Sequence, residues 1–468
     1  MKGRIIREGS FYRQLLLLAL PIAVQNLITQ AVGIADSIML GFADKSGTLL
    51  SASSLANQPF FILSLVCFGL ASGSAVLCSQ YWGKGDRESI RTVISMILKV
   101  AIAISALFSL VILVFPENVM RLFSSNALIC EMGAEYLRIV GFAYLIFGFG
   151  YTLLCSIRSV ELVRVSVVVN ASSFFINVFL NWVLIFGKLG APALGIRGAA
   201  IATLIARITE FVITVIYVFV IDKRLAFRVR HLFRFDRTLA ADLLRHATPV
   251  LLNELMWSLA ISTQAAILGH ITYAQGDPVA ANAVAGMVQQ LATVFIIGLG
   301  NASAVIVGKA IGEGRREEAM RRAYTLTFVS ILVGVFAFVL ILLLQAPILS
   351  LYSLEADTML LARRLIFVVA VVAAFSSPSA TLIMGVLRGA GDTRFCLIGE
   401  MACLWGVAIP AALIGAYVFH LPVPLVLCLM KLDEVLKVFI CLIRMKGGRF
   451  MRTLTRDRTL EKASFTSI

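Results

Sequence analysis

Long apolar stretches separated by short polar ones run along the whole chain of 468 residues. Each stretch is about 20 residues or longer, enough for a helix to cross a hydrocarbon core of ~30 Å, whereas a transmembrane strand needs only ~10 residues. The pattern therefore predicts helices that span a membrane. We predict twelve of them, at residues 14–40, 54–79, 92–116, 133–156, 165–187, 195–221, 247–269, 279–308, 323–344, 365–387, 395–418 and 422–443.

The second half of the chain repeats the first. Residues 69–76 (GLASGSAV) are nearly copied at 298–305 (GLGNASAV), and the glycines of WGKGDRE recur at the same offset in IGEGRRE. Six helices return the chain to its starting side of the membrane, so both halves have the same orientation. The predicted fold class is an all-α membrane protein of two parallel six-helix repeats.

Composition and charge agree with this prediction. Hydrophobic residues make up 60% of the chain and charged residues 14%, beyond the roughly 45–50% apolar share of soluble domains. Most Lys and Arg residues lie before the first helix, in the even-numbered connections and after the last helix, which places both termini in the cytoplasm. We therefore expect a multi-pass protein of the cell inner (plasma) membrane.

The charge asymmetry also predicts how the chain is divided. The net charge of +15 needs no nucleic-acid partner, because anionic membrane lipids attract basic segments that lie on the cytoplasmic surface. The predicted parts are an N-terminal six-helix bundle at 1–222, a basic cytoplasmic linker at 223–246, a C-terminal six-helix bundle at 247–443 and a basic cytoplasmic tail at 444–468.

The sequence gives no sign of enzyme chemistry. The eight Cys are scattered without a CxxC pair, and the four His do not cluster with them, so neither a disulfide framework nor a metal site is expected. A nucleophile–base arrangement and a lysine loop for ATP are also missing. We expect a monomeric, non-enzymatic protein without a cofactor, and any pumping must draw on an ion gradient or on another chain.

A carboxylate at membrane depth costs about 2.5–3.5 kcal/mol and therefore needs a reason to be there. Asp36 lies in the outer half of the first predicted helix, Asn177 and Asn181 share one face of the fifth, and Thr203 has a similar depth in the sixth. These oxygens suit a small cation such as Na⁺, or a carboxylate whose proton affinity is raised by burial. Alternatively, the amides and the hydroxyl only bond neighbouring helices.

The second half does not repeat this set. Gln264 aligns with Asp36, and Glu254 appears where the first half has Asn26. Glu254 is therefore a candidate second-lobe site for an ion or a substrate, or else a glutamate paired with a buried partner for packing. Opposite charges three or four residues apart predict local ion pairs between Arg207 and Glu210 and on the last helix.

Aromatic, thioether and amide side chains lie around the two repeated segments, on the second, seventh and eighth predicted helices. Such groups suit the binding of lipophilic organic cations in a central cleft, although residues at helical spacing also serve as ordinary core. The candidate lining residues are Gln58, Phe60, Phe61, Trp257, Met287 and Gln290.

Taken in order, several motifs resemble the MATE family, the multidrug and toxic compound extrusion transporters. They are LPIAVQN and GIADSIMLG; SASSLA with its looser copy AANAVA; and GLASGSAVLCSQYWGKGD with its copy ending GKAIGEG. Next come NVFLNWVLIFG followed by PALGIRGAAIAT, then MGVLRGAGDTRF, and an acidic last helix leading into RMKGGRF. The resemblance extends over nearly the whole chain.

The resemblance implies two six-helix bundles around a V-shaped central cavity, and efflux of small lipophilic or cationic substrates by alternating access. It also implies that Na⁺ or H⁺ drives antiport through a first-lobe site at Asp36, Asn177, Asn181 and Thr203. Some relatives carry Asp where this chain has Asn181, which puts Na⁺ affinity in question, and the helix-10 aspartate of some relatives has no counterpart here. The alternative function is a flippase for lipid-linked saccharides from the same superfamily.

Overall fold

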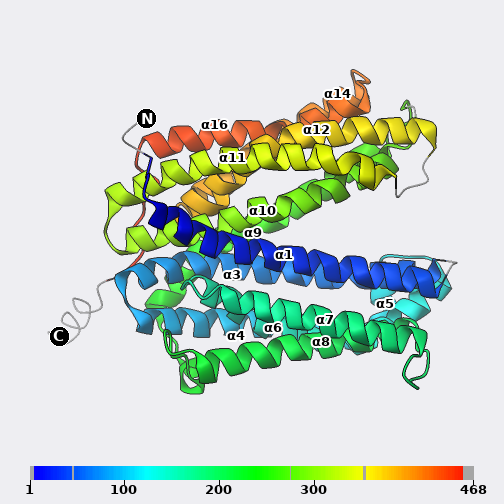
Figure 1. Ribbon diagram of the computed structural model, residues 1–468, viewed down its shortest axis with the longest axis horizontal. Coiled ribbons are helices and arrows are strands. Elements are labelled where there is room, and N and C mark those ends of the chain that lie inside the picture. Colours follow the sequence, from blue (N-terminus) through cyan, green and yellow to red (C-terminus); the bar gives the residue numbers. More distant parts are fainter. Residues whose placement is uncertain (1–4, 45–46, 275, 351–354, 457–468) are drawn as a thin grey trace.

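The protein is described by a computed structural model that covers residues 5–44, 47–274, 276–350 and 355–456. In these ranges all regular structure is helical, and the long helices run back and forth along one bundle (Figure 1). α1 (Gly9–Ala43) begins and α16 (Leu432–Lys446) ends on the same side of the bundle, at the left in Figure 1. This side is called the terminal end below, and the opposite side the far end.

The first six spans form one lobe. It consists of α1; α2 (Thr48–Ala56) with α3 (Gln58–Lys84); α4 (Arg87–Val114) with the short α5 (Pro116–Arg121); α6 (Ala127–Arg158); α7 (Arg164–Phe186); and α8 (Ile196–Ile216) with the π-helical η1 (Tyr217–Ile221). A short 3₁₀ helix, η2 (Val229–Phe233), then leads towards the second lobe.

The second lobe repeats this order. Its elements are α9 (Arg237–Gly269); α10 (Pro278–Gly312); α11 (Arg316–Leu349); α12 (Ala356–Ala380) with the π-helical η3 (Thr381–Leu387); α13 (Thr393–Cys403), η4 (Leu404–Ala408) and α14 (Ile409–Tyr417) in one span; and α15 (Val423–Met430) with α16. In the described residues eleven of the twelve predicted spans are helical stretches long and apolar enough to cross a membrane, and the twelfth corresponds to the two shorter helices α15 and α16.

The structure corrects several predicted helix boundaries. α9 begins ten residues before its predicted start, because the Asp236 carboxylate accepts hydrogen bonds from the backbone N–H groups of Thr238 (2.9 Å) and Leu239 (3.2 Å) and so caps a polar first turn. The second predicted helix is two helices that meet at Asn57, just before Pro59. The last predicted helix is likewise interrupted, at Lys431. Apolar length alone does not reveal such caps and breaks.

The lobes exchange contacts at the terminal end. The first half of α1 packs into a core formed with α10, α11 and η3, whereas the first half of α9 packs into a core formed with α3, α4 and α6 of the first lobe. Further along α1, Leu40 belongs instead to a core made only of first-lobe residues. The two lobes therefore meet at the terminal end and separate towards the far end, around a V-shaped central cavity.

The repeated glycines make this junction possible. A Cβ on Gly83 would lie 2.1 Å from the carbonyl oxygen of Lys309, and one on its counterpart Gly312 would lie 1.9 Å from the carbonyl oxygen of Gln80. Contacts this short are excluded, so only glycine lets α3 and α10 come so close to the opposite lobe. The sequence repeat thus encodes the surface on which the lobes pack.

Candidate functional site

The first-lobe polar site is formed where α1 meets α7 near the far end. The amide nitrogen of Asn181 donates hydrogen bonds to the Asp36 carboxylate (2.5 Å) and to the carbonyl oxygen of Asn177 (3.2 Å). Asn177 and Asn181 lie one helical turn apart on the face of α7 that packs against α1, and both are buried. The structure thus brings three of the four predicted residues into direct contact.

One oxygen beside this carboxylate has no partner. The carbonyl oxygen of Asn181 is buried and accepts no hydrogen bond in the described part of the chain, and the hydroxyl of Thr203 on α8 is buried beside the Tyr136 hydroxyl. A buried oxygen without a partner forfeits about 1–3 kcal/mol. Together with Asp36 and Asn177, the Asn181 and Thr203 oxygens form a set of carboxylate, amide and hydroxyl oxygens that suits a small hard cation.

Two residues of this region were not predicted from the sequence. Tyr136 on α6 interacts electrostatically with Asp36 and lies beside Thr203, and its hydroxyl donates a hydrogen bond to the side-chain oxygen of Asn57 (3.4 Å). Asn57 lies at the break between α2 and α3. The sequence signal for this break is Pro59, two residues after Asn57, where the sequence analysis predicts a continuous helix.

An arginine that interacts with Asp36 is already paired. Arg207 on α8 acts electrostatically on Asp36, but its guanidinium donates to the carboxylate of Glu210 at 2.7 Å, which confirms the predicted local ion pair. The guanidinium also lies 5.2 Å from the ring centres of Phe60 and Phe147. The direct partner of Asp36 is therefore the Asn181 amide, and the arginine that interacts with Asp36 electrostatically forms its ion pair with Glu210.

The second lobe arranges its buried charges differently. Glu254 on α9 accepts a hydrogen bond from the Arg388 guanidinium (3.0 Å), and the same nitrogen donates to the Ser72 hydroxyl of the first lobe (3.1 Å). The Arg388 side chain is only 2% exposed. Glu254 is thus one member of a buried ion pair that also links the two lobes.

A second group of buried charges surrounds Lys437 on α16. Its ammonium nitrogen lies 2.9 Å from Asp433, 3.0 Å from Glu434 and 3.8 Å from Glu400. Glu400 also accepts a hydrogen bond from Asn253 at 2.7 Å. The predicted local pairs on the last helix are therefore present, and they extend to a carboxylate on α13.

The predicted cleft-lining residues fall into two groups. Phe60 is half-buried in the first lobe, where its ring centre lies 4.7 Å from that of Phe147. The other five side chains are exposed: Gln58, Phe61, Trp257, Met287 and Gln290. Their role as a substrate surface stays a prediction.

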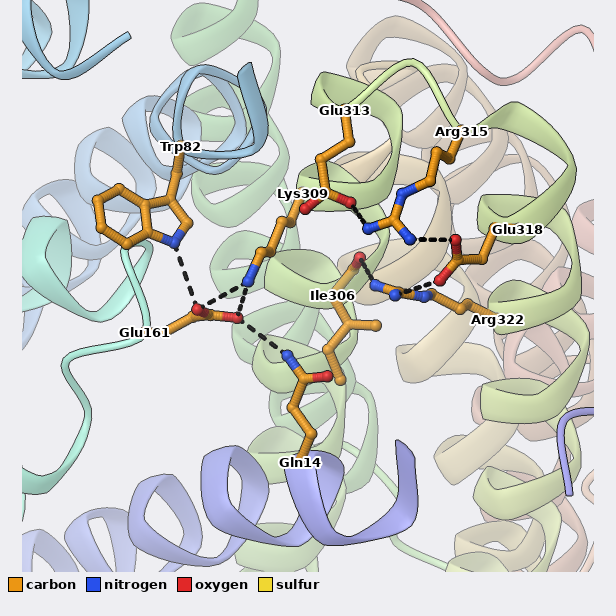
Figure 2. A network of polar contacts seen from close by, with 9 residues as sticks. All are labelled: Gln14, Trp82, Glu161, Ile306, Lys309, Glu313, Arg315, Glu318 and Arg322. Atoms are coloured by element: carbon orange, nitrogen blue, oxygen red, sulfur yellow. Dashed lines mark hydrogen bonds and ion pairs between the residues drawn. The ribbon is translucent and has the colours of Figure 1, made fainter. Parts of the chain in front are cut away.

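Polar contacts hold the lobes together at the terminal end. Figure 2 shows the Glu161 carboxylate of the first lobe facing Lys309 of α10, whose ammonium nitrogen lies 2.8 and 2.9 Å from its two oxygens. Gln14 of α1 (3.0 Å) and the Trp82 indole (3.3 Å) donate to the same carboxylate. One side chain thus joins three helices and both lobes.

Together these features define a class of protein. A duplicated helical bundle with a carboxylate and amides held inside one lobe, and with the lobes separating towards one end, is the architecture of a secondary transporter. In the described residues no three His, Cys, Asp or Glu side chains form a metal site.

Comparisons with known proteins identify the family. The MatE family model matches residues 21–183 and 249–414, one match in each lobe. The chain belongs to the MatE family of membrane transporters, which confirms the resemblance seen in the sequence.

The relatives are similar along their whole length. The chain is 25% identical over 459 residues to the probable multidrug resistance protein NorM of Thermotoga maritima, covering 96% of both chains. It is also 25% identical to the multidrug resistance protein PmpM of Pseudomonas aeruginosa, covering 87% of this chain and 84% of that protein.

Solved structures confirm the fold. A crystal structure of MATE in complex with MaL6 has a TM-score of 0.83 at 18% identity, covering 93% of this chain and 96% of that one. An outward-facing multidrug resistance MATE family transporter has a TM-score of 0.82 at 16% identity, covering 95% and 99%.

Proposed function

We propose that the protein is a cation-coupled antiporter that exports small lipophilic or cationic compounds by alternating access. The names of the relatives, multidrug resistance proteins, support export of varied small molecules. The observation that carries the coupling is the Asp36 site, a carboxylate whose direct partner is the Asn181 amide nitrogen, while the carbonyl oxygen of the same amide accepts no hydrogen bond in the described residues. We place the terminal end in the cytoplasm of the inner membrane, following the distribution of Lys and Arg.

In this orientation Asp36 lies in the outer half of the first lobe, where the two lobes separate. An external Na⁺ or H⁺ binds there, and Asn177 and Thr203 supply further oxygens for Na⁺. Neutralising the carboxylate removes the charge that Asn181 and Arg207 now share. The ion drives transport only because it binds the outward-open and inward-open states with different affinity, since equal affinity shifts no equilibrium.

Gradient-driven efflux by the purified chain tests the proposal. In proteoliposomes, Na⁺ and pH gradients are imposed separately and release of ethidium is followed by fluorescence. We expect one gradient to drive efflux and Asp36→Asn to abolish it. Asp357→Asn, which changes an exposed carboxylate at the start of α12, is the matched control and should transport normally. Full gradient-driven efflux by Asp36→Asn would refute the coupling role.

One observation favours the alternative, a flippase for lipid-linked saccharides. Two arginines, Arg158 and Arg388, line a pocket between the lobes, and a pyrophosphate group is a suitable partner for arginine. The same proteoliposomes distinguish the two functions. A flippase would transfer a polyprenyl pyrophosphate across the bilayer without an ethidium flux.

A further inference from the structure

The chain continues beyond its last helix and crosses the end of the bundle where the lobes meet. After α16 the described residues 447–456 form neither helix nor strand, and Figure 1 shows them as a red trace that leaves α16 at the terminal end and runs towards the first lobe. Gly448 has a φ of +63°, which glycine adopts readily, and the chain turns away from α16 there. Residues 449–456 are called the C-terminal strap below.

The strap is attached first to the second lobe. Phe450 is buried in the core that α10, α11 and η3 form with the start of α1. The backbone N–H of Arg452 donates a hydrogen bond to the carbonyl oxygen of Ala390 (2.9 Å), and the Arg452 guanidinium lies 2.9 Å from the buried Asp392 carboxylate. The start of the strap is thus fixed to the lobe that contains α16.

The next strap residues bond α3 of the first lobe. The side-chain amide nitrogen of the buried Gln80 donates to the carbonyl oxygen of Arg452 (3.1 Å), and the side-chain oxygen of Gln80 accepts from the backbone N–H of Leu454 (2.9 Å). The Leu454 side chain packs against the core formed by α3, α4, α6 and the first half of α9. One buried amide therefore uses both its donor and its acceptor on the strap backbone.

The last described residue of the strap has the most polar contacts. The Arg456 guanidinium forms two hydrogen bonds with the Asp242 carboxylate of α9 (2.6 and 2.9 Å), the paired geometry that arginine offers to a carboxylate. Its backbone N–H donates to the Tyr81 hydroxyl (3.3 Å), and its carbonyl oxygen accepts from the Lys84 ammonium group (2.8 Å). These partners lie on α3 and on the part of α9 that packs into the first-lobe core.

The contacts with the two lobes lie close together along the chain, within residues 452–456. The guanidinium of Arg452 pairs with Asp392 of the second lobe, and the carbonyl oxygen of the same residue bonds Gln80 of the first. An extended chain covers at most about 3.3–3.6 Å per residue, so a segment held at such short intervals cannot follow two lobes that move apart. Opening of the terminal end therefore requires the strap to leave one lobe.

The first lobe is the one that the strap can leave. Phe450 and Asp392, which anchor the strap in the second lobe, are fully buried. The side chains of Arg456 and Asp242 are instead 39% and 16% exposed, and water weakens such a pair. A strap needed only for folding would not have to reach the first lobe at all, because Phe450 and Arg452 already hold it to the second.

We propose that the C-terminal strap is a latch, which holds the terminal end closed and detaches from α3 and Asp242 in the inward-open state. This inference rests on the alternating access of the proposed function and adds to it the element that opposes inward opening. Because the latch contacts form only while the lobes touch at the terminal end, they shift the equilibrium towards the outward-open state by their own free energy.

Spin labels across the terminal end test the latch. Ketone-bearing residues that leave the native cysteines unlabelled are introduced at Arg87 of α4 and Glu317 of α11, two exposed positions, one in each lobe. A chain that ends at Thr453 keeps the second-lobe anchor but lacks Leu454 and Arg456, and a chain that ends at Arg456 is the matched control.

The distance distributions are measured in nanodiscs without substrate or gradient. The ratio of the long, inward-open distances to the short ones should rise about tenfold in the chain that ends at Thr453, the effect of about one net hydrogen bond to a charged group. The control that ends at Arg456 should match the full chain. Equal distributions in the two shortened chains would overturn the latch.

A charge exchange distinguishes a latch from general damage to the fold. Arg456→Asp and Asp242→Arg each place like charges together and should release the strap, whereas the double variant pairs them again with reversed polarity and should restore the short distances. Fluorescence-detected gel filtration establishes that each variant is folded. A folded double variant that stays as open as either single variant would also overturn the latch.

Ethidium efflux by the same proteins separates this inference from the proposed function. If the distances respond as expected but no ion gradient drives efflux by the full chain, the antiport function is wrong and the latch stands. If the full chain transports and the distances do not respond to loss of the strap contacts, the latch is wrong and the antiport function stands.

Discussion

Each lobe pairs a buried glutamate with an arginine, Glu210 with Arg207 and Glu254 with Arg388, but the first lobe also contains Asp36, which forms no ion pair in the described residues. Asp36 has an amide as its direct partner, and the carbonyl oxygen of Asn181 beside it accepts no hydrogen bond. In the second lobe Glu254 faces Arg388, and Lys437 faces three acidic residues. A carboxylate balanced by a protein cation is a structural element, whereas an unbalanced one can accept an ion from solution.

This difference bears on Glu254, which the sequence made a candidate for ion or substrate binding. In the present conformation its charge is matched by Arg388, which also bonds Ser72 across the junction. Glu254 could accept an external ion only after this link between the lobes is broken. Its role as a second ion site therefore stays a prediction. Its contact with Arg388, which also bonds Ser72 of the first lobe, supports a structural role at the junction of the lobes.

The largest expected effect on stability comes from removing the ammonium group of Lys437, which lies among three acidic side chains of the second lobe. Lys437→Met leaves Asp433, Glu434 and Glu400 without their shared ammonium group, and breaking a buried pair costs about 3–5 kcal/mol. The thermal midpoint in detergent, followed by fluorescence-detected gel filtration, should fall by roughly 10 °C. Lys446→Met changes an exposed lysine of the same helix and should shift it little. Equal midpoints for both variants would contradict the claim that Lys437 stabilises the three acidic side chains around it.

The next largest effect is expected at the junction of the lobes, where both lobes contribute an equivalent glycine. Gly83 and Gly312 are equivalent in the repeat, and a Cβ at either would lie about 2 Å from a carbonyl oxygen of the opposite lobe, of Lys309 and Gln80 respectively. Each Gly→Ala change should therefore weaken the junction by about 1–3 kcal/mol and to a similar extent. Spin-label distances across the terminal end should broaden towards longer values in both variants.

Gly286 provides the control for these substitutions. It lies on α10 like Gly312, and a Cβ there would meet nothing within 4 Å. Gly286→Ala should leave the distance distribution unchanged. If Gly83→Ala and Gly312→Ala acted in opposite directions, the junction would not have the symmetry that the repeat implies.

The sequence predicted most of the fold because the fold depends on apolar length and on repetition. The length of an apolar stretch is a local property, and the repeat is visible as a constant offset between two segments of the sequence. The predicted spans and the two parallel lobes followed from these two signals. The position of Asn177 and Asn181 beside Asp36 also followed, since helical spacing and equal depth place side chains without knowledge of packing. Their function in coupling stays a prediction.

The remaining contacts depend on packing between distant segments. Glu254 and Arg388 are 134 positions apart, and no spacing rule relates α9 to the end of η3. Asn57 was missed because the break before Pro59 was predicted as continuous helix, and Tyr136 because a neutral tyrosine on an apolar helix gives no signal. Caps such as Asp236 lengthened helices beyond their apolar part for the same reason: hydropathy does not detect them.

A smaller effect is expected at the polar link between the lobes. Glu161→Gln keeps a group of the same shape but removes the charge that faces Lys309. The pair is partly exposed, so the junction should lose only about 1 kcal/mol. Spin-label distances at the terminal end should shift modestly. Glu318→Gln is the control, because Glu318 pairs with Arg322 inside the second lobe (Figure 2) and its loss should leave the distances between the lobes unchanged.

The smallest effect on stability is expected where the effect on transport is greatest. Asp36→Asn leaves an amide that still bonds Asn181, and no buried cation depends on Asp36 alone, because Arg207 keeps Glu210. The thermal midpoint should therefore change by less than the equivalent of about 0.5 kcal/mol, as for a tolerated substitution. Gradient-driven efflux should nevertheless disappear. A large loss of stability in Asp36→Asn would mean that this carboxylate, like Glu254, serves mainly to balance a charge within the fold, and the contrast between the lobes would be lost.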